Sequence, residues 1–124
     1  NMNKAIELTS EELNISIPEF TVAGVPHGNF FAHQWYIATE DEVNAEVMAE
    51  KIDAHLKILN DDYAVERNHA LKDVKVEVLS QSVFLAFMNA KGKVGGQHKF
   101  PRVLKGETLA EWKKFLEVPA GKID

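Results

Sequence analysis

Cysteine is missing from this chain, and so is any long run of apolar residues. Without cysteine, the protein can form no disulfide, no thiolate-bound zinc site and no cysteine nucleophile. No apolar stretch approaches the ~20 residues that a membrane-spanning helix needs. The N-terminal segment NMNKAIELTSEEL lacks the basic and then apolar build of a signal peptide. We therefore expect a cytoplasmic protein with no membrane partner.

Basic charge is also scarce, except in one stretch. The chain has 14 basic and 19 acidic residues and a net charge of −5. Residues 91–105 contain five of the basic residues and no acid, so the rest of the chain carries nine basic residues against 19 acidic ones. A nucleic-acid-binding protein normally spreads basic charge over a whole face. We therefore expect no nucleic-acid partner, and a local site for one small anion.

The periodicity of the apolar residues predicts helices mixed with strands. Apolar residues three and four apart predict a first helix over residues 2–13, and alternation predicts strands at Glu19–Ala23, HQWYIAT and VKVEVLS. Pro18 marks the start of the first strand because proline cannot donate to a strand ladder. The turn cluster GVPHGN then predicts that the first two strands pair as a hairpin with a long loop.

The ends of the later helices are predicted from capping residues. Side-chain oxygens of threonine, asparagine and aspartate accept the free N–H groups of a first turn. The predicted capping residues are Thr39 with Glu42, Asn60 or Asp61, and Thr108 with Glu111. Gly92 is expected to end the helix that begins in QSVFLAF.

The order α-β-β-α-α-β-α-loop-α predicts an α+β fold. We expect a small sandwich of a mixed β-sheet with helices on one face, close to half of a ferredoxin-like fold, as one domain over residues 1–124. KFPRVL is expected to form a short edge strand. The ferredoxin-like fold has one more strand before the first helix, so we expect a piece of a longer protein. The predicted core residues include Phe84, Phe87, Trp112 and Phe115.

Most of the polar side chains point to structure rather than to chemistry. The five histidines do not have the spacing of a helical metal site, so no metal site is expected, and His55 is placed on a buried stripe. Glu40, Asp41 and Glu42 are interpreted as an acidic helix start. Tyr63 and Arg67 share a helix face four residues apart, which predicts that Arg67 stacks on the ring as local scaffolding.

The stretch KGKVGGQHKFPR is the strongest candidate site. Gly95 and Gly96 let backbone amides approach a ligand closely. Lys99 and Arg102 flank Pro101, which restricts the backbone between them. These residues could bind one phosphate or carboxylate group. The residues alone leave a second interpretation open, a glycine turn with solvated lysines.

Two motifs of this chain occur together in one known family. The first is a helical D-Y-x-x-x-R pattern, and the second is a glycine, glutamine, lysine, proline and arginine pattern near the C-terminus. The matching residues are Asp62, Tyr63 and Arg67, and then Gly96, Gln97, His98, Lys99, Pro101 and Arg102. The chain thereby resembles the C-terminal domain of the Gretchen Hagen auxin-responsive promoter family, the acyl acid amido synthetases. Most plant members carry tyrosine in place of His98 and asparagine in place of Gly96. By these two differences, this chain resembles a bacterial-type member of the family.

The resemblance implies an ATP-dependent, adenylate-forming ligase. A large N-terminal domain of the same protein would bind ATP, with magnesium, and an acyl acid, and an amine would then attack the acyl-adenylate to give an amide. The small C-terminal domain would be a mobile lid that binds no nucleotide alone. The resemblance implies Lys99 as the catalytic residue and Gly95, Gly96, Gln97 and Arg102 as cofactor contacts.

Two other interpretations remain open from the residues. One is a free-standing, non-enzymatic α+β module that binds a small anion or dimerises through its sheet. The other is a nucleic-acid accessory domain, which the acidic balance of the chain disfavours. The gene sequence upstream of Asn1 would distinguish the lid from the free-standing module.

Overall fold

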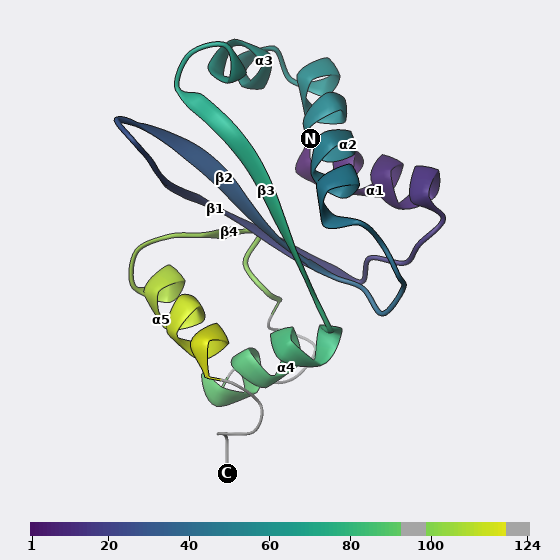
Figure 1. Cartoon of the computed structure of the whole chain (residues 1–124). Helices are drawn as coiled ribbons and strands as arrows, with labels where there is room; N and C mark the ends of the chain where they lie inside the picture. Colours follow the sequence, from purple (N-terminus) through teal and green to yellow (C-terminus); the bar gives the residue numbers. More distant parts are fainter. Residues whose placement is uncertain (93–98, 119–124) are drawn as a thin grey trace.

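A computed structural model describes residues 1–92 and 99–118 of the chain (Figure 1). The helices are α1 (Met2–Leu13), α2 (Ala45–Leu59), α3 (Asp61–Arg67), α4 (Gln81–Ala90) and α5 (Gly106–Glu117). The strands are β1 (Glu19–His27), β2 (Phe30–Ala38), β3 (Leu71–Leu79) and β4 (Val103–Leu104). The predicted α+β class is confirmed, and β4 lies within the segment KFPRVL that was expected to form an edge strand. Within these residues, no helix is both long and apolar enough to cross a membrane.

The strands form one mixed sheet in the order β3-β2-β1-β4. β1 and β2 are antiparallel, whereas β3 runs parallel to β2 and β4 runs parallel to β1. The connection from β2 to β3 passes through α2 and α3, as a parallel pair requires. The two edge strands are therefore β3, with nine residues, and β4, with only two.

The hairpin of β1 and β2 is longer and tighter than the sequence predicted. His27 pairs with Phe30, so the loop consists of Gly28 and Asn29 alone. Gly28 adopts a φ of +61°, the left-handed conformation that such short loops need and that glycine adopts without strain. The prediction of a long loop was wrong because GVPHGN was interpreted as a turn cluster, although Pro26 lies within β1 opposite Phe31.

The helices cover both faces of the sheet, which corrects the expectation of one covered face. Figure 1 shows α1, α2 and α3 on one side and α4 and α5 on the other. Alternate residues of the central strands divide accordingly, since Trp35 packs with the first group and Tyr36 with the second. Strands buried on both faces read as continuous apolar runs rather than as alternating ones. The run WYIA has this character, and in FTVA the one polar residue, Thr21, is itself buried.

The two faces have different cores. The core below α1, α2 and α3 is mainly aliphatic, with Ile52 and Met48 completely buried. The core on the other face, called here the aromatic cluster, consists of Ala23, Tyr36, Ala38, Phe84, Phe87, Met88, Phe100, Leu104 and Trp112. The predicted burial of Phe84, Phe87 and Trp112 is confirmed, and the predicted core residue Phe115 is partly buried at its border. The aromatic cluster includes Phe100 from the candidate loop segment.

Asparagines rather than threonines cap two of the helices. The Asn44 side chain accepts the N–H of Val47 at 3.0 Å, so α2 begins after Asn44 and the predicted Thr39–Glu42 capping box was wrong. Thr39 is buried and instead accepts the N–H of Asp41 at 3.1 Å. Asn60 caps α3 as predicted, through the N–H of Tyr63 at 3.0 Å.

The remaining helix ends gave one correct and one wrong prediction. Gly92 follows α4 with a φ of +73°, as expected for a residue that ends a helix. The predicted capping box of Thr108 and Glu111 was wrong, because α5 begins at Gly106 and Thr108 lies inside its first turn. Both threonine errors share a cause: the spacing of a capping box also occurs by chance just before or inside a helix.

We expect Asn44→Ala to lower the free energy of unfolding by about 1 kcal/mol, because the N–H of Val47 loses its acceptor. Glu42→Ala serves as the control, since Glu42 is exposed and lies before the helix. Urea denaturation of both variants measures the difference. A larger loss for Glu42→Ala than for Asn44→Ala would show that the helix begins at Thr39 after all.

Candidate functional site

Of the candidate segment, residues 91–102, the structure describes residues 91, 92 and 99–102. The predicted contacts Gly95, Gly96 and Gln97 therefore lie outside the described residues, and Lys99 and Arg102 lie within them. From Lys99 onward, burial alternates along the chain. Phe100 and Leu104 are buried in the aromatic cluster, while Lys99, Pro101 and Val103 are exposed.

Phe100 fixes the segment next to Lys99. Its ring centroid lies 4.9 Å from that of Phe84 and 5.1 Å from that of Trp112, both in edge-to-face orientation. The side chain is only 4% exposed. Aromatic pairs in this geometry contribute about 0.5–1.5 kcal/mol beyond the burial of their area. Lys99 is thus an exposed lysine whose next residue is anchored in the core.

Arg102 is directed at the start of β1. Its guanidinium Nη1 donates to the Glu19 carboxylate and, at 2.9 Å, to the carbonyl oxygen of Phe20. Its Cζ lies 4.1 Å from the centroid of the Phe20 ring, in a cation–π contact. Arg102 and Lys99 therefore differ in their surroundings: Arg102 contacts the start of β1, and Lys99 is exposed.

The other basic residues of this stretch also differ in whether they form ion pairs. Lys91 pairs with Glu111 of α5 and lies 5.9 Å from the centroid of the Phe87 ring. Among the described residues, no ion pair involves Lys99 or Lys105. The acids that the stretch itself lacks come from β1 and α5. The positive charge left available to a ligand therefore includes Lys99 but not Arg102 in its present contacts.

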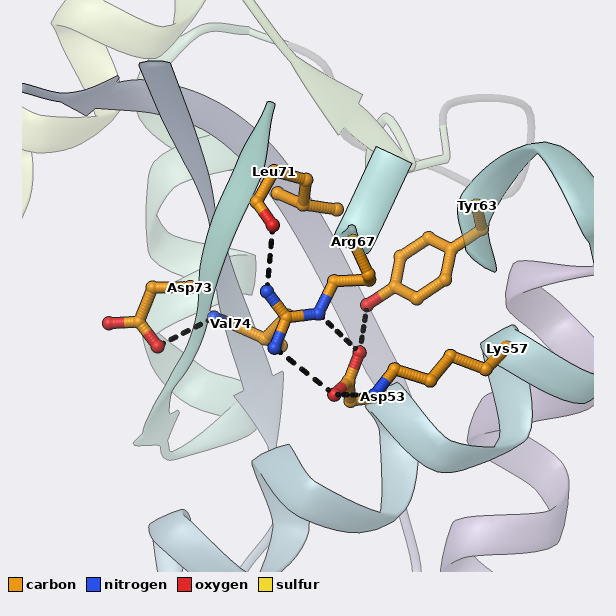
Figure 2. A network of polar contacts seen from close by, with 7 residues as sticks. All are labelled: Asp53, Lys57, Tyr63, Arg67, Leu71, Asp73 and Val74. Carbon is orange, nitrogen blue, oxygen red and sulfur yellow. Dashed lines mark hydrogen bonds and ion pairs between the residues drawn. The ribbon is translucent and has the colours of Figure 1, made fainter. Parts of the chain in front are cut away.

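A second polar cluster joins α2, α3 and β3, on the face of the sheet that α1, α2 and α3 cover (Figure 2). The Asp53 carboxylate accepts the Tyr63 hydroxyl at 2.7 Å and the Arg67 Nε at 2.9 Å. The Arg67 Nη1 donates to the carbonyl oxygen of Leu71 at 2.7 Å. The predicted stacking of Arg67 on Tyr63 is replaced by a shared acceptor. The interpretation of these residues as scaffolding fits, because they tie two helices to the start of a strand.

Burial, hydrogen bonds and charges within this cluster shift the pKa values of Asp53 and Tyr63 in opposite directions. Burial alone would raise the pKa of Asp53, but the hydrogen bonds from Tyr63 and Arg67 and the charges of Arg67 and Lys57 outweigh it and lower that pKa. Burial, and then the hydrogen bond and charge of Asp53, raise the pKa of Tyr63. Asp53 is therefore ionised at neutral pH and Tyr63 is neutral. Sequence reasoning missed Asp53, which has no distinctive spacing from its partners.

A cleft of about 460 Å³ lies beside this cluster, between α2 and β3. Acids outnumber bases in its lining, with Glu46, Glu50, Asp53 and Asp73 against Arg67 and Lys75, and the guanidinium of Arg67 is already bound within the protein. Such a lining repels phosphate and carboxylate groups. The cleft is therefore not the anion site that the sequence predicts.

The remaining candidates serve structural contacts. The predicted acidic start of α2 was wrong: the Glu40 carboxylate accepts the N–H of Gln81 at 2.9 Å, at the start of α4, and the Asp41 carboxylate accepts the N–H of Ser16 at 2.8 Å. His55 is partly exposed and its Nε2 lies 2.6 Å from the Glu12 carboxylate, where it links α2 to α1. In the described part of the chain, no three acidic or histidine side chains form a cluster that could hold a metal ion.

The sequence model of the GH3 family C-terminal domain matches residues 1–108. The chain belongs to the GH3 family. The resemblance that was predicted from the two motifs is thereby confirmed. No curated protein matched the sequence.

Two solved structures share the fold of this GH3 domain. One is described as "GH3.15 acyl acid amido synthetase", with a TM-score of 0.72 and 22% identity over 94% of this chain and 22% of that chain. The other is described as "AtGH3.15 acyl acid amido synthetase in complex with 2,4-DB", with a TM-score of 0.70 and 20% identity over 91% of this chain and 23% of that chain. The GH3 domain described here thus spans about a fifth of their length.

The two GH3 motifs have different structural roles. In the first motif, Tyr63 and Arg67 bind Asp53, while Asp62 is exposed in the first turn of α3. In the second motif, Arg102 binds the start of β1 and Lys99 is exposed. Within the described residues, only the second motif leaves a positively charged group available to a ligand.

We expect Asp53→Asn to lower the free energy of unfolding at pH 7 by about 1–3 kcal/mol, because the hydrogen bonds to Arg67 lose their charged acceptor. The folded-state pKa of Asp53 lies below its unfolded value, so this stabilisation is present above about pH 4 and is lost as the pH falls through the folded pKa. Urea denaturation at pH 7 and pH 3 measures both effects. Glu66→Gln, on an exposed position of α3, is the control.

Proposed function

We propose that this GH3 domain is the C-terminal lid of an ATP-dependent acyl acid amido synthetase. The family match over residues 1–108 supports the assignment, and so does the shared fold with two structures described as acyl acid amido synthetases. The partner would be a large N-terminal domain of the same protein, which would hold the acyl acid and the amine. We place this enzyme in the cytoplasm, where ATP is supplied.

ATP, when bound with magnesium, would supply the adenylyl group that activates the carboxylate of the acyl acid for attack by an amine. This domain would contribute a cation to that chemistry. The observation that carries the proposal is Lys99, an exposed lysine with no ion pair among the described residues and with the buried Phe100 as its neighbour. A lysine ammonium is a compact charge that a moving domain can direct at a phosphate.

The described residues fit this role unequally. Lys99 fits because it is exposed and available. Arg102 fits less well, since its guanidinium is bound by Glu19 and Phe20. The contacts of Gly95, Gly96 and Gln97 with ATP stay predictions. In the part of the chain that the structure describes, no acidic cluster offers a site for magnesium, so we assign magnesium to the ATP phosphates and the N-terminal domain.

The function is tested by incubating the full-length protein with ATP, magnesium, a panel of acyl acids and the common amino acids. We expect AMP and an amide, detected by mass spectrometry, only when all substrates are present. Residues 1–124 alone should form neither product and should show no ATP binding in a calorimetric titration. Release of ADP by the full-length protein, or low-micromolar ATP binding by residues 1–124, would contradict the proposal.

A further inference from the structure

Arg102 is held by more contacts than a solvent-exposed arginine would make. Its guanidinium donates to the Glu19 carboxylate and to the Phe20 carbonyl oxygen at 2.9 Å, and it lies over the Phe20 ring at 4.1 Å. Glu19 is itself oriented, because its carboxylate also accepts the N–H of Phe20 at 3.2 Å. A planar guanidinium that makes charge-assisted and stacking contacts together has one preferred orientation.

The backbone around Arg102 depends on these contacts. β4 has two residues and pairs with β1 only at Val22 and Ala23. One further backbone hydrogen bond runs from the N–H of Val22 to the carbonyl oxygen of Arg102, at 3.0 Å. So short a ladder holds the segment weakly by itself. The Arg102 side chain and the buried Phe100 ring, together with the buried Leu104, therefore add to the attachment of the segment next to Lys99.

We propose that the Glu19–Arg102 pair is a positioning device for Lys99 and that Arg102 does not bind ATP. The inference rests on the proposed function of Lys99. Phe100 and Arg102 fix the chain on either side of Pro101, and Lys99 is the residue directly before the first of these anchors. Displacement of a reacting or stabilising group by about 1 Å can cost 10²-fold in rate. Loosening Arg102 would move Lys99 without removing its charge.

Glu19 separates this inference from a direct contact between Arg102 and phosphate. If Arg102 bound phosphate, Glu19→Gln would free the guanidinium, and activity would stay the same or rise. If Arg102 positions Lys99, Glu19→Gln and Arg102→Gln break the same contact and lower the rate alike. Arg102→Lys adds a third criterion. Lysine keeps the positive charge, but it lacks the planar guanidinium that donates several hydrogen bonds and stacks on the Phe20 ring.

The kinetic experiment uses the full-length protein and follows acyl-adenylate formation. We expect Glu19→Gln, Arg102→Gln and Arg102→Lys each to lower kcat about 10- to 100-fold, with KM for ATP within about twofold of the wild type. The double variant Glu19→Gln with Arg102→Gln should be no slower than the slower single variant. Glu111→Gln, which breaks the neighbouring Lys91–Glu111 pair, is the matched control and should leave the rate unchanged.

A structural measurement keeps this inference distinct from the function on which it rests. In the 124-residue chain, Glu19→Gln and Arg102→Gln should speed hydrogen exchange at the Val22 amide at least tenfold, while amides of α2 keep their protection. Unchanged exchange at Val22 would overturn the positioning device whatever the kinetics show.

The remaining outcomes distinguish an error in the positioning role of Arg102 from an error in the proposed role of Lys99. A normal rate for Glu19→Gln together with a raised KM for ATP in Arg102→Gln would make Arg102 a direct ATP ligand and overturn the inference alone. A normal rate for Lys99→Ala would overturn the role of Lys99 and the positioning role with it, even if exchange at Val22 had increased.

Discussion

Lys99→Ala in the full-length protein is expected to slow acyl-adenylate formation roughly 10²–10³-fold. The size follows from the loss of one preorganised group that stabilises developing charge in a site closed to water. The proposed position of that charge is the α-phosphate, where negative charge builds as the acyl acid attacks. Single-turnover kinetics with radiolabelled ATP would measure this step separately from amide formation.

Lys105→Ala is the matched control for this substitution. Lys105 is also exposed and lies six residues further along the chain, just before α5. It should change the rate less than about threefold, because its charge would face solvent and be screened. If Lys99→Ala also stays within two- or threefold of the wild type while the protein remains folded, the segment is only a glycine turn with lysines on it.

Phe87→Ala is expected to lower the free energy of unfolding by about 3–5 kcal/mol. Phe87 is 3% exposed, and its ring contacts those of Trp112 at 5.0 Å and Phe115 at 5.4 Å between centroids. Removing the ring leaves a cavity among side chains that cannot collapse without disturbing one another. Chemical denaturation monitored by tryptophan fluorescence measures the loss and follows both cores, since Trp112 belongs to this cluster and Trp35 to the core on the other face.

Leu85 offers a control on the same helix. Its side chain is 62% exposed, so Leu85→Ala should change the free energy of unfolding by no more than about 0.5 kcal/mol. A loss below about 1 kcal/mol for Phe87→Ala, or equal losses for both variants, would mean that α4 does not bury the Phe87 side of its surface.

Local patterns in the sequence were enough to predict most of the elements. The alternation of Val74, Val76 and Val78 with charged residues predicted β3, and the asparagine before α3 predicted its cap. It was harder to predict how many faces of the sheet the helices cover. Alternation indicates a strand with one wet face, whereas β1 and β2 carry apolar residues on both faces. The runs FTVA and WYIA held that information, but so short a run of mainly apolar residues does not by itself distinguish a strand from a buried helix segment.

The sequence identified the residue types of the candidate site but not the contacts that those residues make. The basic, glycine-rich segment and the family motif both pointed to Lys99 and Arg102, which the sequence treated as equals. Their difference depends on Glu19, which lies 83 positions from Arg102 and carries no motif. Asp53 was missed for the same reason, since its partners lie 10 and 14 positions away on another helix. Pairing between distant residues is set by the topology of the sheet, which local patterns do not encode.

The attachment of β4 to β1 also sets the order in which this chain can fold. Arg102 and Phe20 are 82 positions apart, whereas two residues connect β1 to β2. A short hairpin closes in microseconds. Closing a long loop first costs conformational entropy, and the stabilising contacts form only afterwards. The lysine-bearing segment therefore docks late. On the ribosome, the outer edge of β1 stays unpaired until residues 99–104 have been made, and a stalled chain would be prone to aggregate at that edge.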